Sequence, residues 1–162
     1  MVEHEEFENV DSGAAKSVPI GVHDIRKGTH ILMGEGRPCK VQEITTSKTG
    51  KHGHAKASIV GTDIFNGRKY EDSCPASYSK ESPTIIRTEW IVNTVSDDGY
   101  VSLLDTKTGK QKEDLKLPND TESDKETSKR ITEGIEAGKT LVVVVLNAMD
   151  IEKIESCKES NE

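Results

Sequence analysis

Short runs of apolar or alternating residues, separated by glycine, proline and Asn-Gly or Asp-Gly pairs, make up most of this chain. Such runs are typical of β-strands. In the first half of the sequence they comprise residues 17–22, 30–33, 39–44, 54–65 and the pair 69–70. An Asn-Gly pair favours a tight hairpin, so Asn66-Gly67 is expected to form a type I′ turn. Several short strands at this spacing predict a small barrel.

A second set of runs follows the polar segment SYSKESPT, residues 77–84, which we interpret as a linker. The expected strands are residues 85–95, 100–104, 110–117 and 140–146. Four strands with a helix before the last favour a Greek-key barrel of the OB type, although that fold has five. The terminal segment MDIEKIESCK, residues 149–158, is expected to be a short helix.

The helix that precedes the last predicted strand spans residues 119–139. The candidate N-caps are Asn119, Asp120, Thr121 and Ser123, and Ser123 with Glu126 has the spacing of a capping box. Ile131 and Ile135 lie four residues apart and therefore share one face. Gly138 is a natural residue to follow the last turn.

Composition limits the size of the hydrophobic core. Hydrophobic residues make up 32% of the chain and charged residues 31%, so any core is modest. The three cysteines, Cys39, Cys74 and Cys157, are odd in number and far apart, which predicts buried thiols and neither a disulfide framework nor a metal site.

The acidic N-terminal segment 1–16 is expected to be disordered and has no apolar run of a signal peptide. The longest apolar run, LVVVVL at 141–146, is too short to cross a bilayer, so a soluble intracellular protein is expected.

Charge is distributed unevenly along the chain. The net charge is −7, yet residues 17–86 hold ten Lys or Arg and seven Asp or Glu. Within them, the segment TTSKTGKHGHAK, residues 45–56, contains no carboxylate. Since salt screens charges over roughly 8 Å, a phosphate near this segment is attracted to it even though the chain as a whole is acidic.

Four interpretations of this basic segment compete. A phosphate-binding P-loop needs a glycine five residues before Gly50 and a Ser or Thr after Lys51, and both are missing. A zinc site at His52 and His54 with Cys39 or Cys74 is disfavoured, because the positive charge of the neighbouring Lys51 repels the cation. A third interpretation is a solvated hairpin tip.

In the fourth interpretation, Lys51 is the functional group. Gly50 and Gly53 bracket it, allow a sharp turn and add no side chains of their own beside it. We expect such a loop to be mobile until a partner binds it. Neighbouring cations disfavour the charged form of an amine, which suits a lysine that reacts as a nucleophile.

The same segment resembles the hypusine loop of the eukaryotic translation initiation factor 5A family, in the string SKTGKHGHAK at 47–56. GRPCK at 36–40, DIF-x-G-x-x-YED at 63–72, DGY at 98–100 and EDLKLP at 113–118 are also similar to that family. The resemblance covers residues 18 to 150. It implies an all-β (mainly β) protein with an SH3-like N-terminal barrel, residues 17–84, followed by a C-terminal OB-fold barrel with one helix, residues 85–162.

By this resemblance, Lys51 is the lysine converted to hypusine. Deoxyhypusine synthase would transfer an aminobutyl group from spermidine, with NAD as the synthase's own cofactor, and deoxyhypusine hydroxylase would add a hydroxyl. The protein would then be a substrate of these enzymes and no enzyme itself, with no cofactor beyond the covalent hypusine, no small-molecule substrate and no metal. The surrounding loop residues expected to contact RNA are Lys48, Thr49, Gly50, His52, Gly53, His54 and Lys56.

The resemblance also implies a role in translation. The family binds the ribosome near the exit site, with hypusine reaching toward the acceptor end of the peptidyl-tRNA. It promotes peptide-bond formation at stalled sites, such as consecutive prolines, and assists termination. A cytoplasmic protein with nuclear shuttling and no membrane partner is expected.

Two other functions stay open at this stage. One is a general RNA-binding or RNA-export module with an unmodified Lys51. The other is a small enzyme with the loop as a lid, although no Ser/His/Asp, Cys/His or paired-carboxylate constellation supports it. Phe65, Trp90 and three tyrosines are the aromatic residues of the two domains, too few for an OB fold that stacks on bases. Trp90 is expected to lie in the second core.

Overall fold

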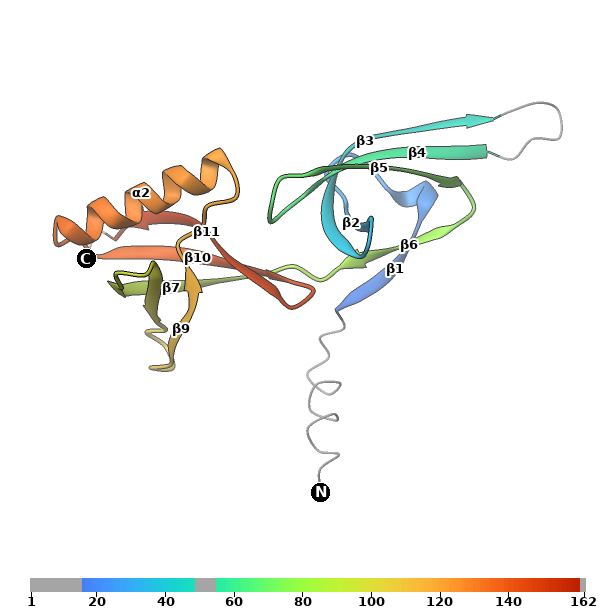
Figure 1. Cartoon of the computed structure of the whole chain (residues 1–162). Helices are drawn as coiled ribbons and strands as arrows, with labels where there is room; N and C mark the ends of the chain where they lie inside the picture. Colours follow the sequence, from blue (N-terminus) through green and yellow to red (C-terminus); the bar gives the residue numbers. More distant parts are fainter. Residues whose placement is uncertain (1–15, 49–54, 161–162) are drawn as a thin grey trace, which may run out of the picture. The chain divides into compact units, whose positions relative to one another are not determined.

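The computed structural model describes residues 16–48 and 55–160. Its contacts divide the chain into two compact units, Met1–Thr84 and Ile85–Glu162. Strands dominate both, and the one α-helix of the described residues belongs to the second unit (Figure 1). The structure is therefore mainly β, as the turn pattern predicts. No helix of these residues has the length and apolar character that crossing a membrane requires.

The first unit is built around a four-stranded antiparallel sheet in the order β2-β3-β4-β5. Its strands are β2 (His30–Met33), β3 (Arg37–Lys48), β4 (Ala55–Asp63) and β5 (Lys69–Pro75). A second, two-stranded sheet pairs β1 (Ser17–Gly21) with β6 (Ser79–Pro83), and a short 3₁₀ helix, η1 (Val22–Asp24), follows β1. The core lies under the alternating inward residues of the sheet, among them Ile31, Cys39 and Ala57, all fully buried.

Strand β6 corrects the linker predicted at residues 77–84. It pairs in full with β1, from Ser17 opposite Pro83 to Gly21 opposite Ser79. Its side chains are held by polar contacts: the Ser82 hydroxyl donates to the His30 carbonyl (2.8 Å), and Lys80 forms an ion pair with Asp72. A strand without apolar alternation carries no hydrophobic signal, which is why the prediction was wrong.

The second unit is a five-stranded barrel with one helix. Its elements in chain order are β7 (Ile86–Val95), β8 (Tyr100–Leu104), β9 (Gln111–Lys116), α2 (Glu122–Glu136), β10 (Leu141–Ala148) and β11 (Ile151–Glu159). The sheet order is β11-β10-β7-β8-β9, and contacts between β9 and β11, including Lys112 to Glu152 (2.7 Å), bring its two edges together. This is the OB arrangement, with the helix between the third and fourth strands.

Strand β11 corrects the terminal helix predicted at 149–158. Ile154 and Cys157 are both buried and lie three residues apart, a spacing that resembles a helix face. The cause is a β-bulge: Val143 pairs with Cys157 and Val145 with Ile154, so β11 has one extra residue there. The extra residue returns Ile154 and Cys157 to the same face of the strand.

The tight turns also differ from the predicted ones. Only Gly67 of the Asn66-Gly67 pair has positive φ (76°), so the expected type I′ turn is wrong. The connection is a longer loop closed by the Gly67 N–H donating to the Asp63 carbonyl (3.0 Å). Met149 and Asp150, with φ of 52° and 64°, form the two-residue turn between β10 and β11.

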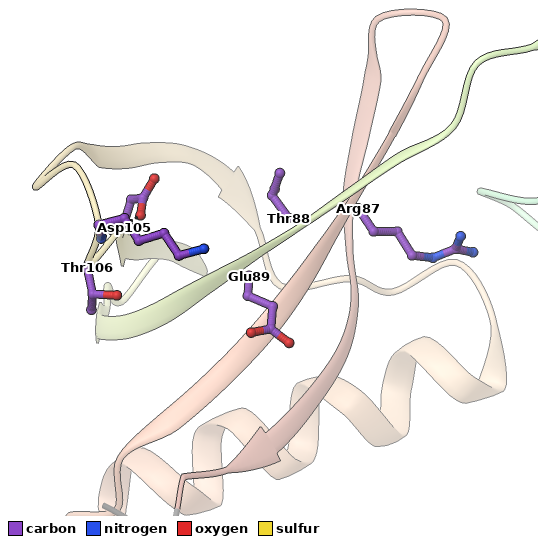
Figure 2. Close-up of a pocket in the computed structure, with 6 residues that line it drawn as sticks. Arg87, Thr88, Glu89, Asp105 and Thr106 are labelled. Atoms are coloured by element: carbon purple, nitrogen blue, oxygen red, sulfur yellow. Dashed lines mark hydrogen bonds between the residues drawn. The ribbon is translucent and has the colours of Figure 1, made fainter.

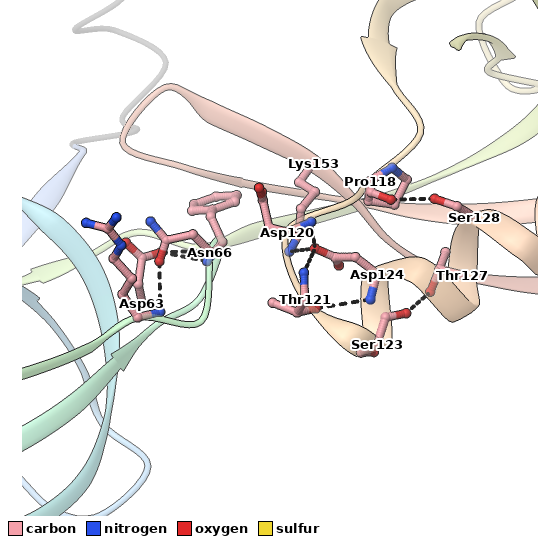
Figure 3. Close-up of polar contacts among 12 residues, drawn as sticks. Asp63, Asn66, Pro118, Asp120, Thr121, Ser123, Asp124, Thr127, Ser128 and Lys153 are labelled. Carbon is pink, nitrogen blue, oxygen red and sulfur yellow. Dashed lines mark hydrogen bonds and ion pairs between the residues drawn. The ribbon is translucent and has the colours of Figure 1, made fainter.

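The N-cap of helix α2 is Thr121, one of the predicted candidates, and Asp124 completes its capping box, so the predicted box of Ser123 and Glu126 is wrong. The Asp124 N–H donates to the Thr121 hydroxyl (3.0 Å), and the Asp124 carboxylate accepts from the Thr121 N–H (3.1 Å). Lys153 of β11 forms an ion pair with the same carboxylate (2.9 Å), as Figure 3 shows. The predicted C-terminal glycine is confirmed, since Gly138 has φ of +75°.

Other core predictions hold in part. Cys39, Cys74 and Cys157 are free and buried, as expected. Trp90 is only half-buried against the second core, and its indole N–H donates to the Thr88 hydroxyl (2.9 Å). The ring therefore covers the edge of the core and does not occupy its centre.

The two candidate caps differ in their predicted effects. Thr121→Ala removes the hydroxyl that accepts from the Asp124 N–H and should lower the free energy of unfolding by about 1 kcal/mol. Ser123→Ala, in the first turn of the helix but not at its cap, should change the free energy of unfolding by less than about 0.5 kcal/mol. Urea unfolding of both variants checks this, and equal losses would contradict the assigned cap.

Candidate functional site

The β3–β4 hairpin carries the basic segment identified in the sequence. Strands β3 and β4 lie side by side (Figure 1). Strand β3 ends at Lys48, β4 begins at Ala55, and these two residues are paired. The structure therefore describes the paired base from which the loop starts and to which it returns. The predicted site residues Thr49, Gly50, Lys51, His52, Gly53 and His54 lie outside the described residues.

The two predicted RNA contacts that are described, Lys48 and Lys56, are both exposed. Lys56 pairs with Ser47, whereas Lys48 pairs with Ala55. Because successive residues of a strand point to opposite faces, Lys48 and Lys56 project from opposite faces of the hairpin. The structure therefore does not bring them together as one patch.

Strand β4 is supported on both sides along its whole length. Its pairing with β5 extends to Lys56 opposite Pro75, and the Ala76 N–H donates to the Ala55 carbonyl (2.9 Å). Beneath it, Ala57 and Ile59 are buried in the core. A three-stranded arm packed on a core bends less than an isolated hairpin, which is marginally stable in water.

Two local irregularities shape this arm. The β3–β4 register shifts between Val41 and Glu43, so β3 contains a bulge at Gln42. A bulge bends and twists its strand. Opposite it, Gly61 packs so closely that an added Cβ would lie 2.6 Å from the Met33 sulfur and 3.3 Å from the Lys40 carbonyl oxygen. A glycine inside a strand pattern was the sequence signal for this close approach.

At the far end of β4, Asp63 holds the base of the hairpin. Its side chain is fully buried and forms an ion pair with Arg37 at the start of β3, with Nε 2.6 Å from Oδ2. Its other oxygen accepts from the N–H groups of Phe65 (2.7 Å) and Asn66 (3.1 Å), contacts shown in Figure 3. The carboxylate thus connects the end of β4 to the start of β3 and to the loop that follows β4.

Burial alone raises the pKa of Asp63, but the Arg37 guanidinium and the two backbone N–H donors outweigh burial and hold the pKa below its ordinary value. Asp63 therefore stays ionised at neutral pH. Sequence reasoning did not single it out, because an aspartate at the end of an apolar strand shows its partners only in the folded chain.

A second carboxylate fixes the outer strand of the arm. Asp72 of β5 pairs with Lys80 of β6, and this contact lowers the pKa of Asp72. The pair connects β5 to the β1–β6 sheet. The side of the arm away from β3 is thereby anchored as well.

The alternative chemistries of the loop gain no support from its surroundings. The element that follows the loop is a strand, whereas a P-loop leads into a helix. Cys39 and Cys74, the proposed zinc partners, are buried in the barrel core, and burial raises the pKa of Cys39 to about 11. His52 and His54, the other residues of that interpretation, lie outside the described residues.

Comparison with known families matches both units. A family model described as translation initiation factor 5A-like, N-terminal, matches residues 15–78. A second, described as eukaryotic elongation factor 5A hypusine, DNA-binding OB fold, matches residues 84–158. The chain belongs to the eukaryotic translation initiation factor 5A family. It is a member of a family of translation factors, not of enzymes, and the resemblance stated from its motifs is confirmed.

Individual relatives agree over nearly the whole chain. Eukaryotic translation initiation factor 5A-3 of Solanum tuberosum is 45% identical over 97% of this chain and 94% of its own length. The 5A-1 protein of Arabidopsis thaliana is 46% identical over 97% of this chain and 96% of its own length. A solved structure of a family protein from Naegleria fowleri has a TM-score of 0.80 and 43% identity, and covers 89% of this chain and 99% of its own.

The base of the hairpin gives a test with a defined pH dependence. Asp63→Asn leaves Arg37 without its buried partner and should lower the free energy of unfolding at pH 7 by about 3 kcal/mol. Because the folded pKa of Asp63 lies below the unfolded value of about 3.9, its contribution is complete above that pH and is lost as the pH falls further. Urea unfolding from pH 7 to pH 2 should show the variant and the parent converging in acid.

Glu71→Gln is the matched control. Glu71 forms a surface ion pair with Lys69 (3.9 Å), and its loss should change stability by less than about 0.5 kcal/mol. A difference between Asp63→Asn and the parent that does not depend on pH would contradict the assignment of the effect to the carboxylate charge.

Proposed function

We propose that this translation factor acts through Lys51, carried at the end of the β3–β4 hairpin and modified to hypusine. The observation that supports the proposal is the pairing of Lys48 with Ala55, which closes the hairpin at the edges of the segment SKTGKHGHAK. The description of the family model that matches the second unit includes the word hypusine. The chain would be the substrate of deoxyhypusine synthase and deoxyhypusine hydroxylase.

Modification changes what the lysine can reach. Transfer of an aminobutyl group from spermidine to the Lys51 amine breaks the C–N bond at the secondary amine of spermidine and releases propane-1,3-diamine. The new C–N bond adds a four-carbon arm, about 6 Å of reach, and a second amine. NAD serves the synthase, so the factor itself needs no cofactor beyond the covalent group. Gly50 and Gly53 place no side chains next to the amine that the synthase must approach.

At the ribosome, the modified side chain would contact the acceptor end of the peptidyl-tRNA. Held there, it would restrict the acceptor arm to reactive geometries, and this entropic contribution needs no acid or base from the protein. The result would be faster peptide-bond formation at stalled sites, including consecutive prolines, and assistance in termination. The site of action would be the cytoplasm.

The basic groups around Lys51 would provide the accompanying RNA contacts. Lys48 and Lys56 project from opposite faces of the hairpin base, so they would contact phosphates on either side of it. His52 and His54 would add contacts within the loop. Each lost phosphate contact should weaken binding and reduce its salt dependence without altering sequence preference.

Lys51→Arg tests the proposal. Arginine keeps the positive charge but offers no amine for the aminobutyl transfer. In an extract depleted of the endogenous factor, the variant should translate a proline-run reporter no better than extract without added factor. Lys56→Arg, which keeps a cation at a residue that is not modified, is the control and should retain activity.

The mass of the Lys51 peptide from native cells separates this proposal from its alternative. A peptide carrying the aminobutyl and hydroxyl groups is expected. An unmodified lysine, or a Lys51→Arg variant that still relieves stalling, would instead favour a general RNA-binding or RNA-export module.

A further inference from the structure

The second unit has two adjoining hollows near the turn between β7 and β8. One has a volume of about 360 Å³ and the other about 400 Å³. Gly99 and Leu117 line both, and the Leu117 N–H donates to the Gly99 carbonyl (2.9 Å) at their boundary. Together the hollows form a groove between this turn, the end of β9 and helix α2, which we call the turn groove.

The first hollow combines an apolar floor with an acidic rim. Val95, Leu117 and Ile135 are half-buried and pack on the barrel core. Asp97 and Glu136 are exposed at the rim, on the turn and on α2 respectively. No lysine or arginine lines this hollow, and within the described parts of the chain neither carboxylate forms an ion pair.

The second hollow combines an apolar wall with polar residues, since Asp98 and Asn119 also line it. Leu117 and the buried Pro118 lie in it, and the Ser128 hydroxyl donates to the Pro118 carbonyl. Lys116 lies at its edge with Nζ 5.1 Å from the centre of the Tyr100 ring. That ammonium is therefore drawn toward the ring, which leaves its aliphatic stem beside the hollow.

A third hollow of the same unit, shown in Figure 2, has a volume of about 470 Å³ but different chemistry. Arg87 at one side is engaged by two hydrogen bonds to Glu155 (2.8 and 3.1 Å). Glu89 pairs with Lys158 (3.7 Å). Because these charges are satisfied within the chain, this hollow offers less to a partner than the turn groove.

We propose that the turn groove binds an extended segment of a partner protein in which an arginine or lysine adjoins an aliphatic residue. The cationic side chain would lay its stem on Val95 and Ile135 and place its charged end between Asp97 and Glu136. The aliphatic side chain would enter the second hollow against Leu117 and Pro118. Long cationic side chains match such a site because their stems are apolar and their ends charged.

Charge excludes the other occupants. Nucleic-acid phosphates would face the two rim carboxylates, which repel them. Residues 1–16 of this chain carry five carboxylates and one lysine, so the protein's own N-terminal segment is repelled as well. The basic segment 45–56 of a second copy fits poorly for another reason, since none of its lysines adjoins a Val, Leu or Ile that could enter the second hollow. The inference does not depend on Lys51 or its modification.

The probe is the synthetic peptide acetyl-Gly-Leu-Arg-Leu-Gly-amide, titrated into the ¹⁵N-labelled full chain. Saturable shifts are expected for the amides of residues 96–99, 117 and 132–136. The same peptide with citrulline, a neutral isostere of arginine, should bind more weakly. Shifts centred elsewhere, or equal binding of a peptide with glutamate in place of arginine, would overturn the proposal.

The rim carboxylates give the matched variants. The double variant Asp97→Asn, Glu136→Gln should weaken binding of the arginine peptide by about tenfold, as expected for two lost charge contacts near the surface. Glu133→Gln, on the same helix but outside the groove, should leave it unchanged. Unchanged binding by the double variant, or the same amides shifting with oligouridylate, would overturn the proposal. So would shifts of these amides when residues 1–15 are deleted, since the chain's own segment would then be the occupant.

Discussion

The pairing of β4 with β3 on one side and β5 on the other is the constraint on which the site depends. It extends from Asp63 at the base to Ala55 at the last residue before the basic loop. At the base, the buried Asp63 joins Arg37 to the following turn, and at the outer strand Asp72 joins Lys80. Small residues allow the strands to pack closely: Gly61 lies against Met33, and Ala57 is fully buried. An arm fixed at this many points holds the loop's two ends at defined positions.

Much of the fold follows from hydrophobic periodicity, and the failures have physical causes. Strands 30–33 and 100–104 were predicted with the bounds they have, because their inward residues alternate. Strand β6 was missed because polar contacts hold it, and β11 was taken for a helix because a bulge spaces Ile154 and Cys157 three apart. For the site, the motif SKTGKHGHAK and its resemblance predict Lys51, which lies outside the described residues and stays a prediction. The role of Asp63 could not be predicted, because it depends on partners that only the folded chain brings together. The opposite faces of Lys48 and Lys56 follow from the strand register, which the local sequence does not contain.

The two units differ in chemistry. The first places a basic segment at the end of a supported hairpin, suited to RNA phosphates. The second has an acidic rim at Asp97 and Glu136 over an apolar floor, suited to a cationic peptide. Under the two proposals above, one chain with two small barrels meets RNA through its first unit and a cationic protein segment through its second, although its net charge of −7 taken alone argues against an RNA partner.

Shortening the hairpin tests most directly whether its length positions Lys51. Deleting Thr46, Ser47, Lys56 and Ala57 removes two pairs of residues that lie opposite each other in β3 and β4. Ala55 then takes the buried position of Ala57. Because each strand loses two residues, every remaining side chain keeps its original face. The loop is kept intact but withdrawn by roughly 7 Å. The shortened chain, compared with Lys56→Ala, should fold yet fail to relieve stalling on a proline-run reporter. Full activity of a folded, shortened chain would contradict the role assigned to the arm.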